Sequence, residues 1–291
     1  MTLATFFVQC LNSMQYGLLL FLVASGLTLV FGIMGIVNLA HGSFYMIGAY
    51  LAYSLTALTG NLFVALALGL VLSLIFGYLL EWVFFSFLYE RDHLQQVLMT
   101  YGLILVIEEL RSILIGDDVH GVAVPAFLAG SIAIGNDMLY PVYRLFVSAA
   151  CVMLALALYW LIRKTLVGMK IRAGASNREM AQSLGIDIGL LYRVVFSLGF
   201  GLAVMSGMLF APVSTVYPGM GAQMLIVCFL VVVIGGIGSI TGAFVAALLI
   251  GFVDTFGKVL WQEGAGIAIY LLMAAILLVR PAGLLGERAA R

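Results

Sequence analysis

The sequence predicts an all-α polytopic membrane protein with eight to nine transmembrane helices, and two observations carry that prediction. Of the 291 residues, 64% are hydrophobic, only 9% are charged, and the mean hydropathy is +1.20. So little charge cannot cover the surface of a soluble domain of this size. In addition, several windows free of charge reach the length of about 20 residues that a helix needs to cross a bilayer. We therefore treat residues 1–291 as a single transmembrane domain.

Nine apolar windows follow one another along the chain, and each predicts a helix. They cover residues 11–31, 38–58, 62–88, 97–115, 142–162, 194–212, 223–237, 241–259 and 265–280. The window at 223–237 is short and runs into "GGIGSITG", so it is either a full crossing or a broken, re-entrant piece. A full crossing gives nine helices, and a re-entrant piece gives eight.

The basic residues predict the orientation of the chain, because cytoplasmic loops carry an excess of Lys and Arg. Residues 163–193 hold six of the 13 basic residues, and residues 280–291 hold three more. The loop 116–141 has three Asp and no basic residue. We expect the first two segments to be cytoplasmic and the loop 116–141 to lie outside. An even number of crossings must then join the two basic segments, which favours nine helices and an outer N-terminus.

The stretch "FGIMGIVNLAHGSFYMIGAY" places Asn38, His41 and Gly42 between apolar segments. Polar side chains in a membrane must point at protein or water, so these residues are candidates for the translocation pathway. Two other interpretations stand beside that one. His41 can hydrogen-bond a carbonyl of a neighbouring helix and stabilise packing alone, or a helix can start here, capped by Asn38, with its positive end toward an anionic group.

Two pairs of oppositely charged residues in the apolar segments have the spacing that brings side chains together on one face of a helix. Glu108 and Arg111 are three residues apart, and Asp254 and Lys258 are four apart, so each pair predicts an ion pair near a helix end. A proton relay would use the same residue types, but plausible partners nearby favour interfacial anchors.

The loop 163–193 contains the pattern of a short amphipathic helix, which Asn177 or Ser176 can cap. An ordinary solvated loop explains such a helix equally well. We expect Gly185 to end that helix. "EMAQSLG" also resembles the front half of the E-A-A-x-x-x-G loop by which bacterial ABC importer permeases dock onto their ATPases, with Glu179, Ala181 and Gly185 matching and Met180 departing. The resemblance makes these three residues and the adjacent Arg178 candidates for ATPase coupling.

A second resemblance runs through almost the whole chain. The stretches "GLTLVFGIMGIVNLAHGSFYMIGAYLA", "LQQVLMTYGLIL", "GMKIRAGASNREMAQSLGID" and "GGIGSITGAFVAALLIG" together look like the LivH/LivM permease family of high-affinity branched-chain amino-acid ABC transporters. The resemblance implies an ABC importer permease fold with a cytoplasmic coupling helix in a bacterial inner membrane. It also implies a heterodimer with a LivM-like permease, two cytoplasmic ATPase subunits and a periplasmic solute-binding protein. Members of the family also carry urea, amides and other small solutes.

The sequence contains no pattern that predicts catalysis or a metal site. It has no HExxH, no GxSxG and no CxxC, and it lacks the Walker A pattern G-x-x-x-x-G-K-[ST]. ATP must therefore bind to partner subunits if it drives transport. The leading hypothesis is an ATP-driven importer of branched-chain or related small amino acids. The alternative is a stand-alone channel or secondary carrier for a small polar solute such as urea, which would not need the long basic loop.

Overall fold

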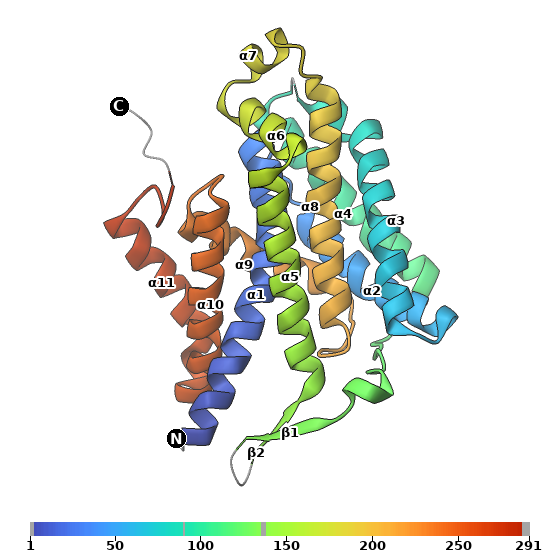
Figure 1. The fold of residues 1–291 in the computed structure, drawn as a ribbon, viewed down its shortest axis with the longest axis vertical. Coiled ribbons are helices and arrows are strands. Elements are labelled where there is room, and N and C mark those ends of the chain that lie inside the picture. Colours follow the sequence, from blue (N-terminus) through green and yellow to red (C-terminus); the bar gives the residue numbers. More distant parts are fainter. Residues whose placement is uncertain (1–2, 90, 135–137, 287–291) are drawn as a thin grey trace.

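The computed structural model describes residues 3–89, 91–134 and 138–286, and this part of the chain is almost entirely helical (Figure 1). The α-helices are α1 (Leu3–Met34), α2 (His41–Thr59), α3 (Leu62–Val83), α4 (His93–Ile115), α5 (Val142–Lys164), α6 (Leu166–Ser176), α7 (Arg178–Ser183), α8 (Ile188–Phe210), α9 (Met220–Gly235), α10 (Ile240–Leu260) and α11 (Ala265–Val279). Two strands, β1 (Ser131–Ile134) and β2 (Met138–Pro141), pair antiparallel with Ser131 opposite Pro141.

Every apolar window of the sequence coincides with a helix: α1 to α5 and α8 to α11. Among the described helices, α1, α3, α5, α8 and α10 are long and apolar enough to cross a membrane, and α9 and α11 are shorter apolar helices. The chain is thus a multi-pass membrane protein by length and composition. The count of eight to nine crossings stays a prediction, because α2 and α9 begin inside the protein, as described below.

Polar caps and glycines set the helix boundaries. Asn61, Asp187 and Ser239 precede α3, α8 and α10, and each side chain accepts a hydrogen bond from a backbone N–H in the first turn. Gly236 follows α9 with a φ of 101°, a conformation that residues with a Cβ rarely adopt. These local signals mark where α3, α8 and α10 begin and where α9 ends.

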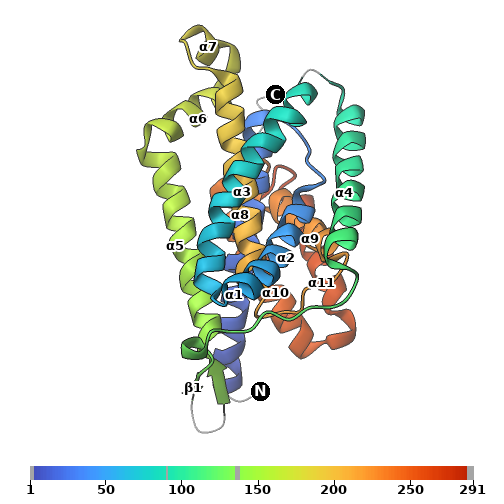
Figure 2. The ribbon, with the colours of Figure 1, turned by 90° about the vertical axis from the view of Figure 1, so that its right-hand side faces the viewer.

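The centre of the bundle is formed by α1 and α8, which run antiparallel and in close contact (Figure 2). A Cβ added at Gly26 of α1 would lie 2.5 Å from the carbonyl oxygen of Gly199 in α8. Ser206 of α8 donates a hydrogen bond to the Leu19 carbonyl of α1 at 3.2 Å. Close backbone approach at small residues is how helices associate in lipid, where apolar burial adds little.

The bundle has two ends that carry different elements (Figure 1). The helices α6 and α7 project at one end, which we call the coupling end. The hairpin β1–β2 lies at the opposite end with the start of α1, and we call this the hairpin end. The basic loop 163–193 and the acidic loop 116–141 therefore lie on opposite sides of the bundle, as their charges predict.

Candidate functional site

The loop at the coupling end is built by three local signals. Thr165 caps α6 by accepting a hydrogen bond from Gly168 N at 3.1 Å, and Asn177 caps α7 through Met180 N at 2.9 Å. Gly185 follows α7 with a φ of 83°, and the next N–H, that of Ile186, donates to the Ala181 carbonyl at 3.1 Å. The sequence thus predicts both ends of α7, while the separate helix α6 was not predicted.

The loop 163–193 at the coupling end has one buried residue in α7 and an exposed face. Ala181 is buried against the protein, whereas Arg178, Glu179 and Gly185 are exposed. The Arg178 guanidinium lies over the Tyr192 ring of α8, 5.4 Å from the ring centroid. Two large apolar side chains, Met180 and Leu184, are also exposed, at 65% and 77%. A short helix therefore presents both charged and apolar groups at the tip of the molecule.

An ion pair between a buried carboxylate and a partly exposed arginine joins the start of α8, which follows this loop, to α3. No pattern in the sequence predicted it. Glu81 of α3 is fully buried, and its Oε2 lies 3.6 Å from Nε of Arg193 in the second turn of α8. Arg193 also lies over the Tyr78 ring at 5.9 Å. The partners are 112 positions apart in the sequence (193 − 81), so no local spacing signals the contact.

Asn38 and His41 lie in the interior, where the chain turns back between α1 and α2. The side-chain oxygen of Asn38 accepts a hydrogen bond from Ala40 N at 3.0 Å, which stabilises the turn before the helix and does not cap the helix itself. His41 is fully buried, and its Nε2 lies 2.9 Å from the carbonyl oxygen of Val23, in the middle of α1. Helix α2 therefore begins deep in the bundle, and His41 makes the carbonyl contact that the packing interpretation expects.

Gly42 brings the starts of α2 and α9 together. A Cβ on Gly42 would lie 2.1 Å from the Gly221 carbonyl oxygen and 2.7 Å from Leu225 Cβ, so only glycine allows this approach. Two helices thus begin next to each other in the protein interior. Broken helices of this kind are common at the solute sites of transporters.

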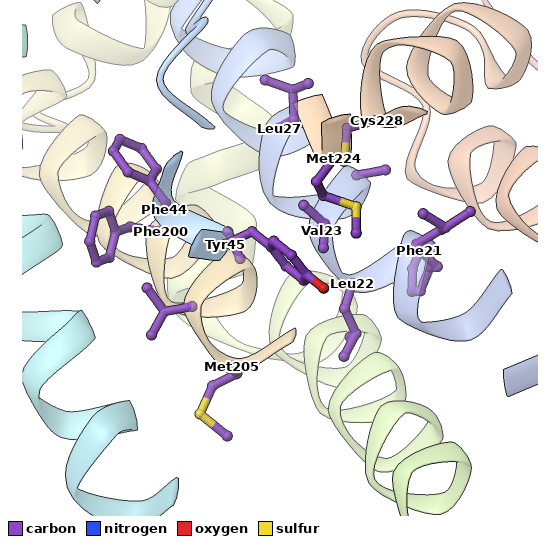
Figure 3. Packing of buried hydrophobic residues seen from close by; sticks show 14 of the residues in the cluster. Phe21, Leu22, Val23, Leu27, Phe44, Tyr45, Phe200, Met205, Met224 and Cys228 are labelled. Carbon is purple, nitrogen blue, oxygen red and sulfur yellow. The ribbon is translucent and has the colours of Figure 1, made fainter. Parts of the chain in front are cut away.

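A cavity of about 590 Å³ lies among the first half of α1, the starts of α5 and α9 and the ends of α8 and α10. We call it the polar cavity. It is lined by Gln9, Asn12, Gln15, Tyr16, Tyr45, Arg144, Phe210, Val213, Ser214, Tyr217, Met220, Gln223, Met224, Val227, Asp254, Thr255, Lys258 and Val259. Tyr45 of α2 reaches between Leu22 of α1 and Met224 of α9 (Figure 3). Asn38, His41 and Gly42 do not line it, although Gly42 contacts Gly221, the neighbour of the lining residue Met220.

The polar cavity contains charges that the sequence analysis assigned to an interface or did not consider. The predicted Asp254–Lys258 pair is present at 2.6 Å, and Lys258 lies over the Tyr16 ring at 5.8 Å. Arg144, near the start of α5, donates a hydrogen bond to Asn12 Oδ1 at 2.6 Å. The second predicted pair, Glu108 with Arg111, is present at 3.5 Å but lies away from this cavity.

A bundle of apolar helices that surrounds a polar cavity and projects a capped helical loop is the architecture of a membrane permease. The chain belongs to the family described as branched-chain amino acid transport system / permease component, whose model matches residues 9–279. This family membership confirms the resemblance found in the sequence.

Curated relatives match over nearly their full length. The permease protein BraD of a high-affinity branched-chain amino acid transport system in Pseudomonas aeruginosa is 30% identical, over 96% of this chain and 95% of BraD. The corresponding LivH of Escherichia coli K12 is 28% identical, over 97% of this chain and 96% of LivH. Among solved structures, PsaBC from Streptococcus pneumoniae in complex with Fab is similar with a TM-score of 0.51, 11% identity and coverage of 92% and 89% of the two chains. That last likeness concerns the fold alone.

Proposed function

We propose that this chain is the membrane-spanning permease subunit of a binding-protein-dependent importer of branched-chain amino acids, driven by ATP that separate subunits hydrolyse. The single observation that carries the proposal is membership of the branched-chain amino acid permease family over residues 9–279. The names of BraD and LivH support the same class of solute. The assembly comprises a second, LivM-like permease, two ATPase subunits that bind the ATP, and a periplasmic solute-binding protein.

In this proposal the coupling end faces the cytoplasm of a bacterium, across its inner membrane, and the hairpin end faces the periplasm. The charge of the loops supports that orientation, because the loop 163–193 carries six basic residues and the loop 116–141 carries none. The binding protein then delivers its solute at the hairpin end, where the polar cavity opens.

The exposed face of α7 is the ATPase contact in this proposal. The exposed side chains of Arg178 and Glu179 supply the charges of this contact, and the buried Ala181 holds α7 against the bundle. Gly185 sets the angle at which the chain leaves α7. The Glu81–Arg193 pair connects the start of α8, directly after the loop, to α3. A movement of α7 is therefore transmitted to the helices around the interior. Asn38, His41 and Gly42, the candidates for the translocation pathway, act in this proposal by packing the start of α2 behind the wall of the polar cavity.

The test is ATP-driven uptake in proteoliposomes that contain both permeases, the ATPases and the binding protein. We expect Gly185→Arg to abolish both copurification of the ATPase and uptake, because an arginine at a φ of 83° is strained and bulky at the docking surface. Gly60→Arg is the matched control: Gly60 is also exposed, follows a helix with a φ of 66°, and has no atom near its Cβ position, but it lies between α2 and α3, away from the coupling end.

Two results would contradict the proposal. The coupling role of α7 is wrong if Gly185→Arg and Gly60→Arg leave ATPase binding and uptake equally intact. Solute uptake by this chain alone, without any ATPase subunit, would instead support the channel or secondary-carrier alternative.

A further inference from the structure

The ionisable side chains of the polar cavity do not balance one another. Arg144, Asp254 and Lys258 line it, and the carboxylate of Asp254 is already paired with Lys258 at 2.6 Å. Among the described residues no carboxylate forms an ion pair with Arg144. The cavity therefore carries one positive charge, on the half-buried Arg144, that lacks an anionic partner among the described residues.

The position of the Arg144 guanidinium is held by neutral groups. Its Nη1 donates to Asn12 Oδ1 at 2.6 Å, and Asn12 in turn donates through Nδ2 to Gln9 Oε1 at 3.3 Å. Both amides line the same cavity. A guanidinium has five N–H donors in a planar fork that matches a carboxylate, so this arrangement orients Arg144 and leaves other donors free for an anion.

A second, independent observation concerns Gln15, which is 4% exposed and also lines the cavity. Its Nε2 has no hydrogen-bond partner within the described structure. A buried amide donor without a partner is costly, and native proteins rarely retain one without a ligand or water to satisfy it. Gln15 lies one turn of α1 from Asn12, so the donor without a partner and the amide that holds Arg144 lie on neighbouring turns of one helix.

The inner wall of the cavity has the opposite character. It consists of Tyr45 from α2 and Met220, Met224 and Val227 from α9, and Tyr45, Met220 and Met224 are nearly fully buried. Figure 3 shows Tyr45 close to Met224 among the buried apolar side chains. Methionine side chains adapt to aliphatic groups of different shape. The cavity thus combines an unpaired cation and amide donors with an apolar, adaptable wall.

We propose that the polar cavity binds the solute inside this single chain and recognises it as a carboxylate: Arg144 pairs with the carboxylate of a free aliphatic amino acid, Gln15 donates to the same end, and the side chain of the amino acid packs against Met220, Met224 and Val227. This inference rests on the proposed transport function and adds a specificity-determining residue to it. It excludes urea and simple neutral amides as ligands of this cavity, because they bring no charge to neutralise Arg144.

The experiment measures binding of radiolabelled leucine to the complete purified transporter without its binding protein, so that only the membrane part is probed. Leucine, leucinamide and urea compete for the labelled site. We expect leucine to compete at least tenfold better than leucinamide, which lacks the carboxylate, and urea not to compete. Arg144→Gln should lower the affinity for leucine by about ten- to a hundredfold, the range for a lost hydrogen bond to a charged group. The affinity for leucinamide should stay unchanged.

Two further variants separate ligand recognition from folding. Asn12→Ala removes the partner of Arg144 but keeps the cation, so the preference for leucine over leucinamide should persist. Arg144→Lys should restore part of that preference, because it restores the charge without the planar fork. Arg91→Gln removes an exposed arginine from the loop before α4, whose side chain contributes nothing to the cavity, and serves as the matched control.

The inference is overturned if Arg144→Gln binds leucine as the wild type does, or if leucinamide and urea compete as well as leucine. It is also overturned if Asn12→Ala erases the preference as fully as Arg144→Gln, since the effect is then one of packing. Failure of the proposed function gives a different pattern: the wild-type transporter then shows no ATP-dependent uptake of leucine, whatever its binding. If leucine uptake depends on ATP but leucine binding does not depend on Arg144, the proposed function is supported and only this inference is wrong.

Discussion

The contact between Gly42 and Gly221 makes a quantitative prediction about how α2 and α9 hold the interior together. In Gly42→Ala the new Cβ would lie 2.1 Å from the Gly221 carbonyl oxygen and 2.7 Å from Leu225 Cβ. Ordinary contact begins at 3.4 Å, so the two helix starts must separate by more than 1 Å at this point. Forcing an extra methyl group into a packed site costs about 1–3 kcal/mol, and the obstacle here is backbone, so the upper end applies.

Against this cost stands the gain from replacing glycine in a helix, about 0.5–1 kcal/mol. The net effect of Gly42→Ala is therefore a loss of about 2 kcal/mol, which lowers the unfolding midpoint by about 4–8 °C. Gly102→Ala in α4 is the matched control, because no atom lies within 4 Å of its Cβ position. It keeps the helix gain without the clash and should raise the midpoint slightly.

The assay is a thermal unfolding scan of the detergent-solubilised protein, followed by circular dichroism and by the fraction that stays monodisperse. The close approach of α2 and α9 is wrongly described if Gly42→Ala raises the midpoint as Gly102→Ala does. A drop confined to Gly42→Ala supports the contact, and a parallel loss in solute binding would place the contact at the inner end of the polar cavity.

Two further predictions concern buried polar groups. His41→Ala should lower the free energy of unfolding by about 2–4 kcal/mol, because it removes the hydrogen bond to Val23 and leaves an empty volume. The initial rate of uptake per correctly inserted molecule should stay near that of the wild type, because His41 does not line the polar cavity. A properly folded variant with no uptake would show that His41 contacts the solute. Arg193→Ala should lower the unfolding midpoint because it leaves the buried Glu81 carboxylate without its cation, whereas the double change Glu81→Gln with Arg193→Ala should recover much of that loss, and thermal scans showing strictly additive effects would refute the pair.

Much of the fold could be predicted from the sequence, because the signals involved are local. The apolar windows located nine helices, and Asn177 and Gly185 marked both ends of α7. The predicted pair of Asp254 and Lys258 is present because the four-residue spacing places both on one helix face. Each of these signals depends on residues within one or two helical turns.

The candidate site was predicted only in part. The sequence drew attention to Asn38, His41 and Gly42 because polar groups and glycines are conspicuous in an apolar stretch, and the structure places all three at the start of α2. Arg144 carried no such signal: an arginine near the start of a membrane helix is ordinary as an interfacial residue. Its unpaired state and its place in a cavity become visible only when α1, α5, α9 and α10 surround it.

The sequence by itself therefore determined that this chain is a multi-pass membrane permease with an exposed helical loop of mixed charge, because composition, hydropathy and family patterns are properties of the chain read in order. The tertiary structure decided where α2 and α9 begin, which charges lack a partner, and where polar groups meet an apolar wall. These are properties of residues far apart in the chain. They depend on helix packing at glycine contacts such as Gly26 with Gly199 and Gly42 with Gly221, where the absence of a side chain decides how closely two backbones approach.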